Sequence, residues 1–363
     1  MKRVLFTDLD DLALGAQILG SGGGGDPDYD LLIAKRQFEI FGGVDLLDVN
    51  ELEEDAFVAP LSFMGAPLAG IEKLPNGNEF LVILKKIEEV MRKKVTCLLP
   101  AEIGGGNAFI PLIVASQLGL PVVDADTLGR AFPELQMSSC NLKGISPSPA
   151  FLSDCYGNTA VIYARDGKEV ERLCRKMTVE MGSIAALSIY MMSGKQVKTA
   201  TIRGSISKAI KIGRAMREAR ENGKDPVDSL LLQTGGIVLG SGMVVDIDQR
   251  IRDGFLKGTF TIHSREGNLQ VLYQNEFLAV FSKGKALAST PDIIIPLEEE
   301  TRKPISSETL LCGLRVILLA IPGEDLWKTS EGLSLVGPEY FSYSIDYNLI
   351  NLKKEEKCCL QNI

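Results

Sequence analysis

The chain has 363 residues, of which 45% are hydrophobic, and its 39 Lys and Arg against 47 Asp and Glu give a net charge of −8. This hydrophobic fraction is typical of a folded globular protein and excludes extensive disorder. At about 150 residues per domain the chain has room for two domains. The acidic balance argues against a nucleic-acid partner, and no apolar run reaches the roughly 18 to 20 residues of a membrane span.

The N-terminus and the cysteines predict a cytoplasmic protein. Asp8, Asp10 and Asp11 interrupt the apolar core that a secretory signal peptide would need. The seven cysteines form no CxxC pair or Cys/His cluster, a pattern that favours reduced thiols over disulfides or zinc. The polar residues 353–363 are expected to form a frayed tail.

The first part of the chain alternates helical and strand-like segments. In chain order we expect helices over 8–20 and 29–41, strands over 46–50 and 56–65, an amphipathic helix over 78–94, a strand over 95–100, a helix over 108–119, a strand over 121–126, and helices over 166–182 and 205–222. Apolar strands that alternate with helices predict a mostly parallel sheet covered on both faces. Residues 1–232 are therefore expected to form a three-layer α/β domain.

After Leu232 the pattern changes to short β-rich segments separated by glycine. Regular strand spacing with little helix predicts a smaller antiparallel barrel-like or sandwich domain over residues 233–345. The aromatic segment 332–352 could return to pack on the first domain.

The first glycine run consists of Gly22, Gly23, Gly24 and Gly25. Glycine loses more backbone entropy on folding than other residues, so a run implies unusual backbone angles or a close approach. Its N–H groups could converge on an anion or on a developing oxyanion; a flexible turn is the alternative. The run follows a predicted helix and no P-loop lysine accompanies it, which disfavours a nucleotide motif.

The second run, Gly104, Gly105 and Gly106, is followed by Asn107 and lies between the predicted strand 95–100 and a helix. Loops at the carboxyl ends of parallel strands are where open α/β sheets bind ligands. Asn107 could cap the helix or present its amide to a substrate carbonyl. The alternative is tight packing of the strand against the helix.

Asp124 and Asp126 follow the next predicted strand, and Arg130 comes shortly after them. Alternation along a strand places both carboxylates on one side, where they could share a proton or hold a divalent metal. Arg130 could bind a substrate carboxylate through two hydrogen bonds. Alternatively, Asp126 caps the following helix and Arg130 pairs with Glu134 at helical spacing.

In the β-rich part, Asn275 and Glu276 follow the strand-like segment LQVLYQ and could reach a neighbouring site. A hairpin end explains them equally well. His263, the single histidine, has strand periodicity and is more typical of a surface or packing residue.

Three segments together resemble the S-methyl-thiohydantoin desulfurase-like family: LGSGGGGDPDYD at 19–30, IGGGNAFIPLIVASQLGLPVVDADTLGRAFPELQM at 103–137, and YQNEFLAV with PDIIIPLEEET within 273–301. The resemblance extends over about residues 8–350. It implies an N-terminal three-layer α/β domain, a C-terminal barrel-like domain, and hydrolysis of an S-methylated thiohydantoin ring with release of a thiol. It does not assign catalytic residues.

The sequence thus predicts a hydrolase of a small five-membered cyclic amide or thio-amide. Asp124 or Asp126 would be the general base, and the amides of the two glycine loops, with Asn107, would stabilise the developing negative charge. No cofactor is predicted, although a divalent metal on the two aspartates would activate the water instead. A non-catalytic binding or regulatory protein and an ATP-dependent hydantoinase-like subunit are the alternatives. A homo-oligomer would be compatible with the sequence.

Overall fold

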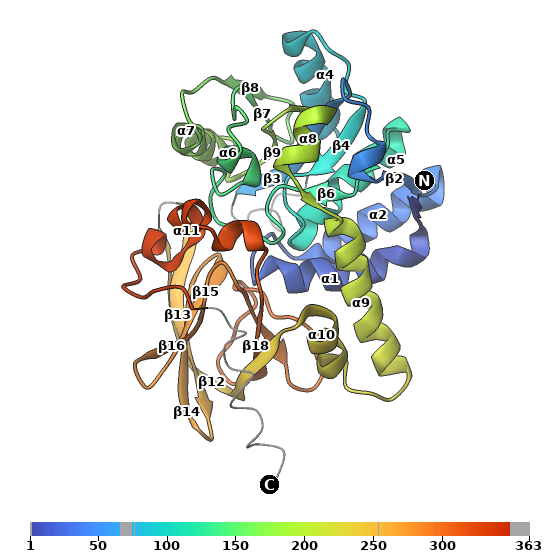
Figure 1. The fold of residues 1–363 in the computed structure, drawn as a ribbon. Coiled ribbons are helices and arrows are strands. Elements are labelled where there is room, and N and C mark those ends of the chain that lie inside the picture. The colour runs from blue at the N-terminus through green and yellow to red at the C-terminus, as the bar shows by residue number, and fades with distance from the viewer. Residues whose placement is uncertain (1, 66–74, 76, 253, 349–363) are drawn as a thin grey trace.

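The computed structural model describes residues 2–65, 75, 77–252 and 254–348. Within these residues the chain forms a nine-stranded sheet and a seven-stranded sheet, which occupy the upper and lower parts of Figure 1. Strands of the first sheet all precede residue 194, and those of the second begin at residue 237. A small two-stranded ribbon pairs β6 (Ala125–Asp126) with β11 (Ile202–Arg203).

The first sheet is mixed, with the order β1-β2-β5-β4-β3-β9-β7-β8 and β10 paired to β3. Its strands are β1 (Lys2–Val4), β2 (Val44–Leu47), β3 (Phe57–Gly65), β4 (Cys97–Pro100), β5 (Val122–Val123), β7 (Ala150–Ser153), β8 (Thr159–Ile162), β9 (Ile184–Ser188) and β10 (Met192–Ser193). The parallel pairs lie together in the centre, from β2 to β3. The α/β class is confirmed, but antiparallel strands flank this centre. One reason is that β7 and β8 are joined by a short loop, which permits only an antiparallel pair.

Helices cover both faces of the first sheet. On β4, the adjacent residues Leu98 and Leu99 belong to different hydrophobic clusters, as strand alternation requires. The cluster of Leu98 includes residues of α1 (Leu9–Gly20), α2 (Pro27–Phe41), α4 (Glu79–Met91), α5 (Ile110–Leu118) and α9 (Ser205–Glu221). The cluster of Leu99 includes residues of α6 (Ser139–Leu142), α7 (Gly167–Glu180) and α8 (Gly194–Ala200). The result is the three-layer arrangement expected from the sequence.

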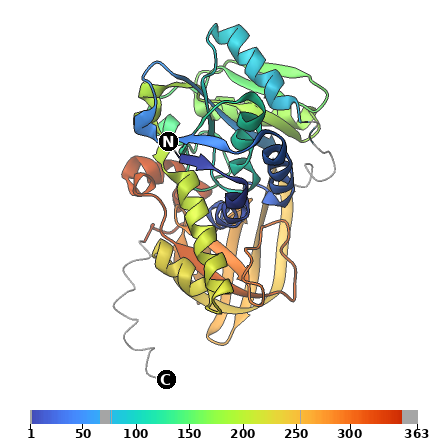
Figure 2. The same cartoon turned by 90° about the vertical axis from the view of Figure 1, so that its right-hand side faces the viewer.

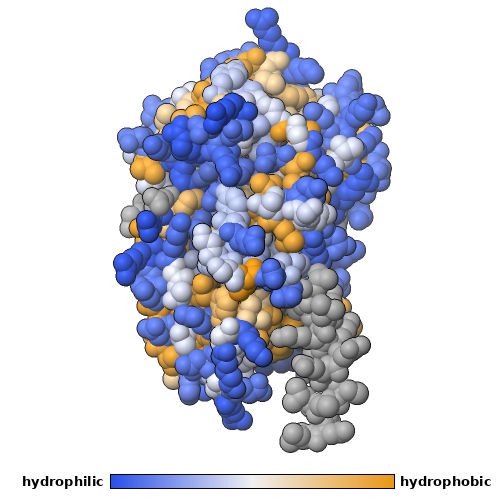
Figure 3. Space-filling view, turned by 60° about the vertical axis from the view of Figure 1, so that its left-hand side comes forward, coloured by the Kyte–Doolittle hydropathy of each residue, from blue (hydrophilic) through white to orange (hydrophobic). Residues whose placement is uncertain are grey.

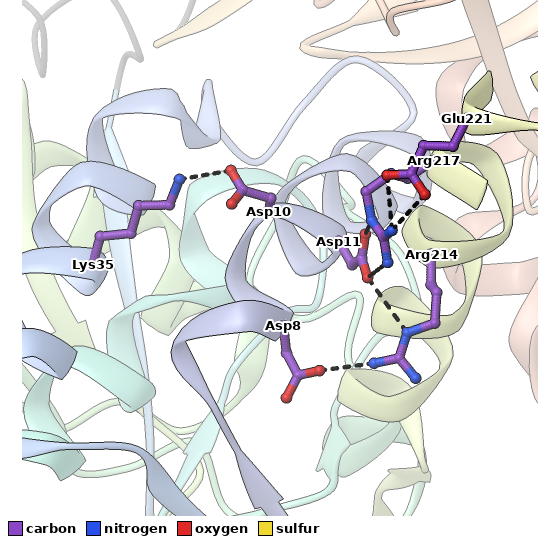
Figure 4. A network of polar contacts seen from close by, with 7 residues as sticks. All are labelled: Asp8, Asp10, Asp11, Lys35, Arg214, Arg217 and Glu221. Carbon is purple, nitrogen blue, oxygen red and sulfur yellow. Dashed lines mark hydrogen bonds and ion pairs between the residues drawn. The ribbon is translucent and has the colours of Figure 1, made fainter. Parts of the chain in front are cut away.

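Helices α1 and α9 cross closely and are tied by ion pairs. A Cβ on Gly15 would overlap the backbone of Ala209, so this crossing requires glycine. At the N-terminal end of α1, the buried Asp11 carboxylate accepts hydrogen bonds from Arg217 at 2.7 and 3.0 Å and from Arg214 at 3.4 Å (Figure 4). Figures 1 and 2 show that α9 extends from the first sheet down along the second part of the chain.

The second sheet is antiparallel and curls into a half-barrel, with the order β16-β15-β14-β13-β12-β18-β17. It is preceded by α10 (Pro226–Thr234), and its strands are β12 (Ile237–Arg252), β13 (Phe255–Ser264), β14 (Gly267–Gln274), β15 (Glu276–Ser282), β16 (Lys285–Ser289), β17 (Ile293–Glu298) and β18 (Arg315–Ile321). Its inner face continues the cluster that contains Leu98, so both sheets share one hydrophobic core.

The end of the described chain packs against residues 128–137. It comprises the short helices η4 (Asp325–Lys328), α11 (Ser330–Val336) and η5 (Pro338–Phe341). The Trp327 indole N–H donates to the Leu128 carbonyl at 2.8 Å, and the Tyr340 hydroxyl donates to Glu134 Oε2 at 2.8 Å. The predicted tail 353–363 lies outside the described residues.

The surface agrees with the acidic, globular composition. The face shown in Figure 3 is mostly hydrophilic, with apolar residues in small groups. Among the helices that the structure describes, none has the length and apolar character needed to cross a membrane.

Candidate functional site

A cavity of about 410 Å³ lies where β3, the loop after β4, the first glycine run and the β14–β15 turn meet. This volume falls within the range of small-molecule sites. Its wall has an acidic and an apolar part. The acidic residues are Asp26, Asp28, Asp30, Glu102, Glu134, Glu276 and Glu308, and the larger apolar and aromatic residues include Phe63, Met64, Leu128, Phe132, Leu135, Ile184, Ile189 and Tyr190.

The two glycine runs pack directly against each other. A Cβ on Gly24 would lie 2.6 Å from the Gly104 carbonyl carbon, and a Cβ on Gly105 would overlap the Gly24 backbone. The Gly106 N–H donates to the Gly25 carbonyl at 3.3 Å. Of the two runs, Gly24 and Gly25 line the cavity, whereas Gly104, Gly105 and Gly106 lie outside the lining. The close contact between the two loops is therefore the main structural reason for glycine at these positions.

The first run also contacts the second sheet. The Phe277 N–H donates to the Ser21 carbonyl at 2.7 Å, and the Ser307 N–H donates to the Gly22 carbonyl at 3.1 Å. Cβ atoms on Gly22 and Gly23 would overlap the Phe277 ring and the Glu276 carboxyl, respectively. The run thus joins the two sheets, and its first two glycines lie outside the cavity lining.

Asp30 is positioned by the start of α2. Pro27 occupies the first turn, and the Asp26 carboxylate caps the helix by accepting the Asp28 N–H at 2.9 Å. Asp30, one turn later, lies against Gly106, where a Cβ would overlap its Oδ2 atom. Burial, and secondarily the Asp26 carboxylate, raise the pKa of Asp30 to about 7.

Glu102 and Asn107 form a second polar group on the wall. Asn107 Oδ1 accepts the Phe63 N–H at 2.7 Å, and its Nδ2 donates to the Phe63 carbonyl at 3.3 Å and to Glu102 Oε1 at 2.5 Å. Asn107 therefore joins β3 to the Glu102 loop and does not cap α5, whose N-cap has no side-chain hydrogen bond. Burial raises the pKa of Glu102 to about 8, although the Asn107 hydrogen bond acts in the opposite direction.

Asn275 and Glu276 both line the cavity. Asn275 adopts φ 57° and exchanges two hydrogen bonds with the Leu256 backbone, at 2.8 and 2.9 Å, so it shapes the turn between β14 and β15. Glu276 is 3% exposed, and its Oε2 atom has no hydrogen-bond partner in the described part of the chain. Burial, and then the nearby Glu102, raise the pKa of Glu276 well above its usual range, while Arg130 opposes the shift.

Arg130 lies behind the cavity wall, outside the lining. It is 1% exposed and donates to the backbone carbonyls of Ala131, Pro291 and Asp292 at 2.9, 3.1 and 2.6 Å. Its guanidinium lies 4.7 Å from the centroid of the Phe132 ring. Its Nη2 atom has no hydrogen-bond partner in the described part of the chain, and its positive charge opposes the raised pKa of Glu276. The binding of a substrate carboxylate by Arg130 stays a prediction.

Asp124 and Asp126 lie next to the glycine loops but outside the cavity lining. The Asp124 carboxylate accepts the Ser207 N–H at 3.0 Å and the Ser207 hydroxyl at 2.5 Å, at the start of α9. Asp126 Oδ2 accepts backbone N–H groups at 2.8 to 3.2 Å from Ile103, Leu128 and Gly129. Within the residues described, no group of three or more His, Cys, Asp or Glu is arranged to hold a metal ion. The catalytic and metal-binding roles of the two aspartates stay predictions.

Sequence reasoning did not assign a role to Asp30, Glu102 or Glu308. A signal existed for Asp30, because it lies four positions after the helix cap Asp26, and residues at this spacing lie on the same face of a helix. Glu102 immediately precedes the second glycine run, which also could have marked it. Glu308 lies in an irregular segment between β17 and β18 and carries no such pattern.

Comparison with known proteins gives a consistent result. Residues 7–164 match the family model "S-Me-THD-like, N-terminal domain", and residues 165–350 match "S-Me-THD-like, C-terminal domain". A crystal structure of a protein from Chromobacterium violaceum is similar over 96% of this chain and 100% of its own, with 26% sequence identity and a TM-score of 0.80. Among curated proteins no match was found.

Proposed function

Because the chain belongs to the S-Me-THD-like family, we propose that it is a cytoplasmic hydrolase of a small five-membered ring of the hydantoin or S-methyl-thiohydantoin type. The observation that carries this proposal is the cavity, whose wall combines apolar side chains with carboxyl groups of raised pKa. Groups that titrate near neutral pH are suited to move protons during hydrolysis. The free thiols of Cys97, Cys140 and Cys174 support a reducing compartment.

In this proposal Asp30 is the general base. It lines the cavity, unlike Asp124 and Asp126, and with a pKa of about 7 a large fraction of it is ionised at neutral pH. Asp30 removes a proton from water while the water oxygen bonds to the ring carbon that carries the methylthio group. The negative charge then develops on the ring nitrogen and is stabilised by the amides of Gly24 and Gly25, the two glycines of the first run that line the cavity.

Glu102 is the general acid. Its pKa of about 8 keeps it protonated at neutral pH, and Asn107 fixes the orientation of its carboxyl group. When the carbon–sulfur bond breaks, the sulfur takes this proton and leaves as methanethiol. The proton left on the added oxygen moves to the ring nitrogen, so the ring keeps this oxygen as a carbonyl. The proton on Asp30 returns through solvent to Glu102.

The test is release of methanethiol from S-methyl-thiohydantoin by the purified full chain. Methanethiol should be measured in the headspace by gas chromatography, because thiol reagents would also react with the exposed Cys312. We expect Asp30→Asn to lower kcat by about 100-fold or more, in the range typical of a lost general base. Glu266→Gln, at an exposed hairpin acid outside the cavity lining, is the matched control.

Two results would contradict the proposal. One is full activity of the folded Asp30→Asn protein, which would remove the base from the mechanism. The other is tight binding of the ring without turnover, measured by calorimetry, which would favour the non-catalytic binding protein.

A further inference from the structure

The charged groups around the cavity are strongly unbalanced. Seven acidic side chains line it, whereas the only basic one among the described residues is Arg175. Arg175 already pairs with Glu171, donates to the Pro133 carbonyl at 3.1 Å, and stacks at 4.1 Å over the Phe255 ring. It therefore has its own partners, and among the residues that the structure describes the acidic groups face the cavity without a matching cation.

A second, independent observation concerns Glu276 and Glu308. Glu276 is 3% exposed, and its Oε2 atom has no hydrogen-bond partner in the described part of the chain. The Oε1 atom of the half-buried Glu308 also has no hydrogen-bond partner there. A buried acceptor without a partner destabilises the protein, and more so if it is charged. Two such atoms on one cavity wall indicate a ligand that brings hydrogen-bond donors.

The two glutamates line the same cavity, and Glu276 also lies near Glu102, the proposed general acid. Burial, then Glu102 and more weakly Glu308, raise the pKa of Glu276, so the two glutamates are within electrostatic range of each other. Both are fixed by the first glycine run, because Phe277 N–H donates to the Ser21 carbonyl and Ser307 N–H to the Gly22 carbonyl. Each glutamate is thus adjacent to a residue that anchors the second sheet to the run.

The remaining wall suits an uncharged ring. Phe63 and Phe132 supply flat apolar surface, and Tyr190 adds a third ring held in a strained backbone conformation at φ 57°. A ligand that satisfies both parts of the wall has an apolar or aromatic-like ring at one end and a group rich in N–H donors at the other.

We propose that the cavity selects rings with a positively charged substituent, an alkylammonium or guanidinium arm, and that Glu276 and Glu308 bind this arm. The inference rests on the proposed ring hydrolysis and names its substrate class. It disfavours rings with a carboxylate arm, because Arg175 in the lining already pairs with Glu171 and Arg130 lies behind the wall, where it donates to backbone carbonyls.

Proton release gives this selection a pH dependence. Burial, and then Asp26, raise the pKa of Glu308 to about 7, and a bound cation lowers the pKa of neighbouring carboxyl groups. Binding of the arm should therefore release protons and become tighter as the pH rises from about 6 to 8. Within the described residues, the titratable and charged groups that face the cavity or interact with these glutamates are Asp26, Asp28, Tyr29, Asp30, Glu102, Glu134, Arg175, Tyr190, Glu276 and Glu308, with Asp126 and Arg130 behind them.

The experiment compares three hydantoins by calorimetry, which are product-type rings without a methylthio group: 5-(4-aminobutyl)-, 5-pentyl- and 5-(4-carboxybutyl)hydantoin. The first two have arms of equal length and differ in charge. We expect the aminobutyl ring to bind at least about tenfold tighter than the pentyl ring, the effect of roughly 1.4 kcal/mol from one partly buried ion pair. The carboxybutyl ring should bind most weakly.

Variants locate the effect. Glu308→Gln should reduce the ratio of aminobutyl to pentyl affinity towards one, and Glu276→Gln should do the same, while Glu266→Gln keeps the ratio of the unaltered protein. Circular dichroism and the thermal unfolding midpoint establish that each variant is folded. If Glu276→Gln fails to fold, the half-buried Glu308 position still provides the test.

The outcomes separate this inference from the proposed hydrolysis. Equal or tighter binding of the pentyl ring, no binding of any ring, or an unchanged ratio in folded Glu308→Gln protein overturns the selection for a cation, even if methanethiol is released. The expected order of affinities without methanethiol release overturns the hydrolase and leaves the cation selection standing.

Discussion

Replacing Gly24 with alanine tests the contact between the two glycine runs. The structure gives Gly24 a φ of +79° and places its missing Cβ 2.6 Å from the Gly104 carbonyl carbon and 3.1 Å from the Gly105 nitrogen. Both neighbours are backbone atoms, which cannot move without shifting the second run. The substitution therefore combines backbone strain with overpacking.

The expected loss of stability can be divided between these two causes. A left-handed backbone costs a residue with a Cβ about 1–2 kcal/mol, and overpacking of a close contact costs about 1–3 kcal/mol more. Gly24→Ala should thus lower the free energy of unfolding by about 2–5 kcal/mol. Gly25→Ala is a matched control, because Gly25 has a φ of +81° but nothing within 4 Å of its missing Cβ. It should lose only the first part, about 1–2 kcal/mol.

Urea unfolding followed by tryptophan fluorescence provides the assay. Trp327 is the single tryptophan, is fully buried, and lies 5.3 Å from the Phe132 ring, so its emission reports on the region where the end of the chain meets the first domain. The reasoning is refuted if Gly24→Ala unfolds at the same urea concentration as Gly25→Ala. Equal losses would mean that the runs separate without cost.

Three further predictions concern charged groups. First, kcat/KM for ring hydrolysis should rise as Asp30 ionises at a pKa of about 7 and fall as Glu102 ionises near 8, and a flat profile from pH 6 to 9 would contradict these roles. Second, burial raises the pKa of the Asp30 carboxyl, so the folded protein holds a proton that the unfolded chain loses above about pH 4, and this stabilisation disappears as the pH rises through about 7. Asp30→Asn should therefore increase the free energy of unfolding at pH 8.5 by about 1 kcal/mol relative to Glu266→Gln, with a smaller gain at pH 5. Urea unfolding measures this gain, and an equal gain at the two pH values would count against the prediction. Third, Asp11→Asn should lower the free energy of unfolding by about 2 kcal/mol, because it breaks charged hydrogen bonds at a buried carboxylate. Asp10→Asn, at an exposed pair with Lys35, should lower it by less than about 1 kcal/mol in the same denaturation assay. Equal losses would contradict the network in Figure 4.

Long periodic segments were predicted well from the sequence. The expected strand over 56–65 is β3 at Phe57–Gly65, and the expected helix over 205–222 is α9 at Ser205–Glu221. The strand can be predicted because it is a compact apolar run of strand length, and the helix because its apolar residues recur at helical spacing. The antiparallel edge formed by β7, β8 and β9 was not predicted, because pairing direction depends on the connecting loops and on distant partners.

The candidate site shows the same limit for side chains. The glycine runs, Asn107 and Glu276 were identified from local pattern, and Gly24, Gly25, Asn107 and Glu276 line the cavity. The direction of Asp124 could not be predicted, because its partner Ser207 comes 83 residues later in the chain. Local sequence indicates where polar groups gather, whereas the fold determines which of them face the open space.

The walls of the cavity come from many segments between residues 24 and 309, among them 62–65, 132–135, 275–276 and 308–309, so they span most of the sequence. During synthesis, a chain that ends before residue 308 lacks one of the two glutamates proposed to bind the cationic arm, even if its first sheet is already formed. No contiguous fragment of either sheet contains the whole binding surface. Ligand binding would thus be a late event in the life of the chain, and a measurable signal that both sheets have reached their final positions.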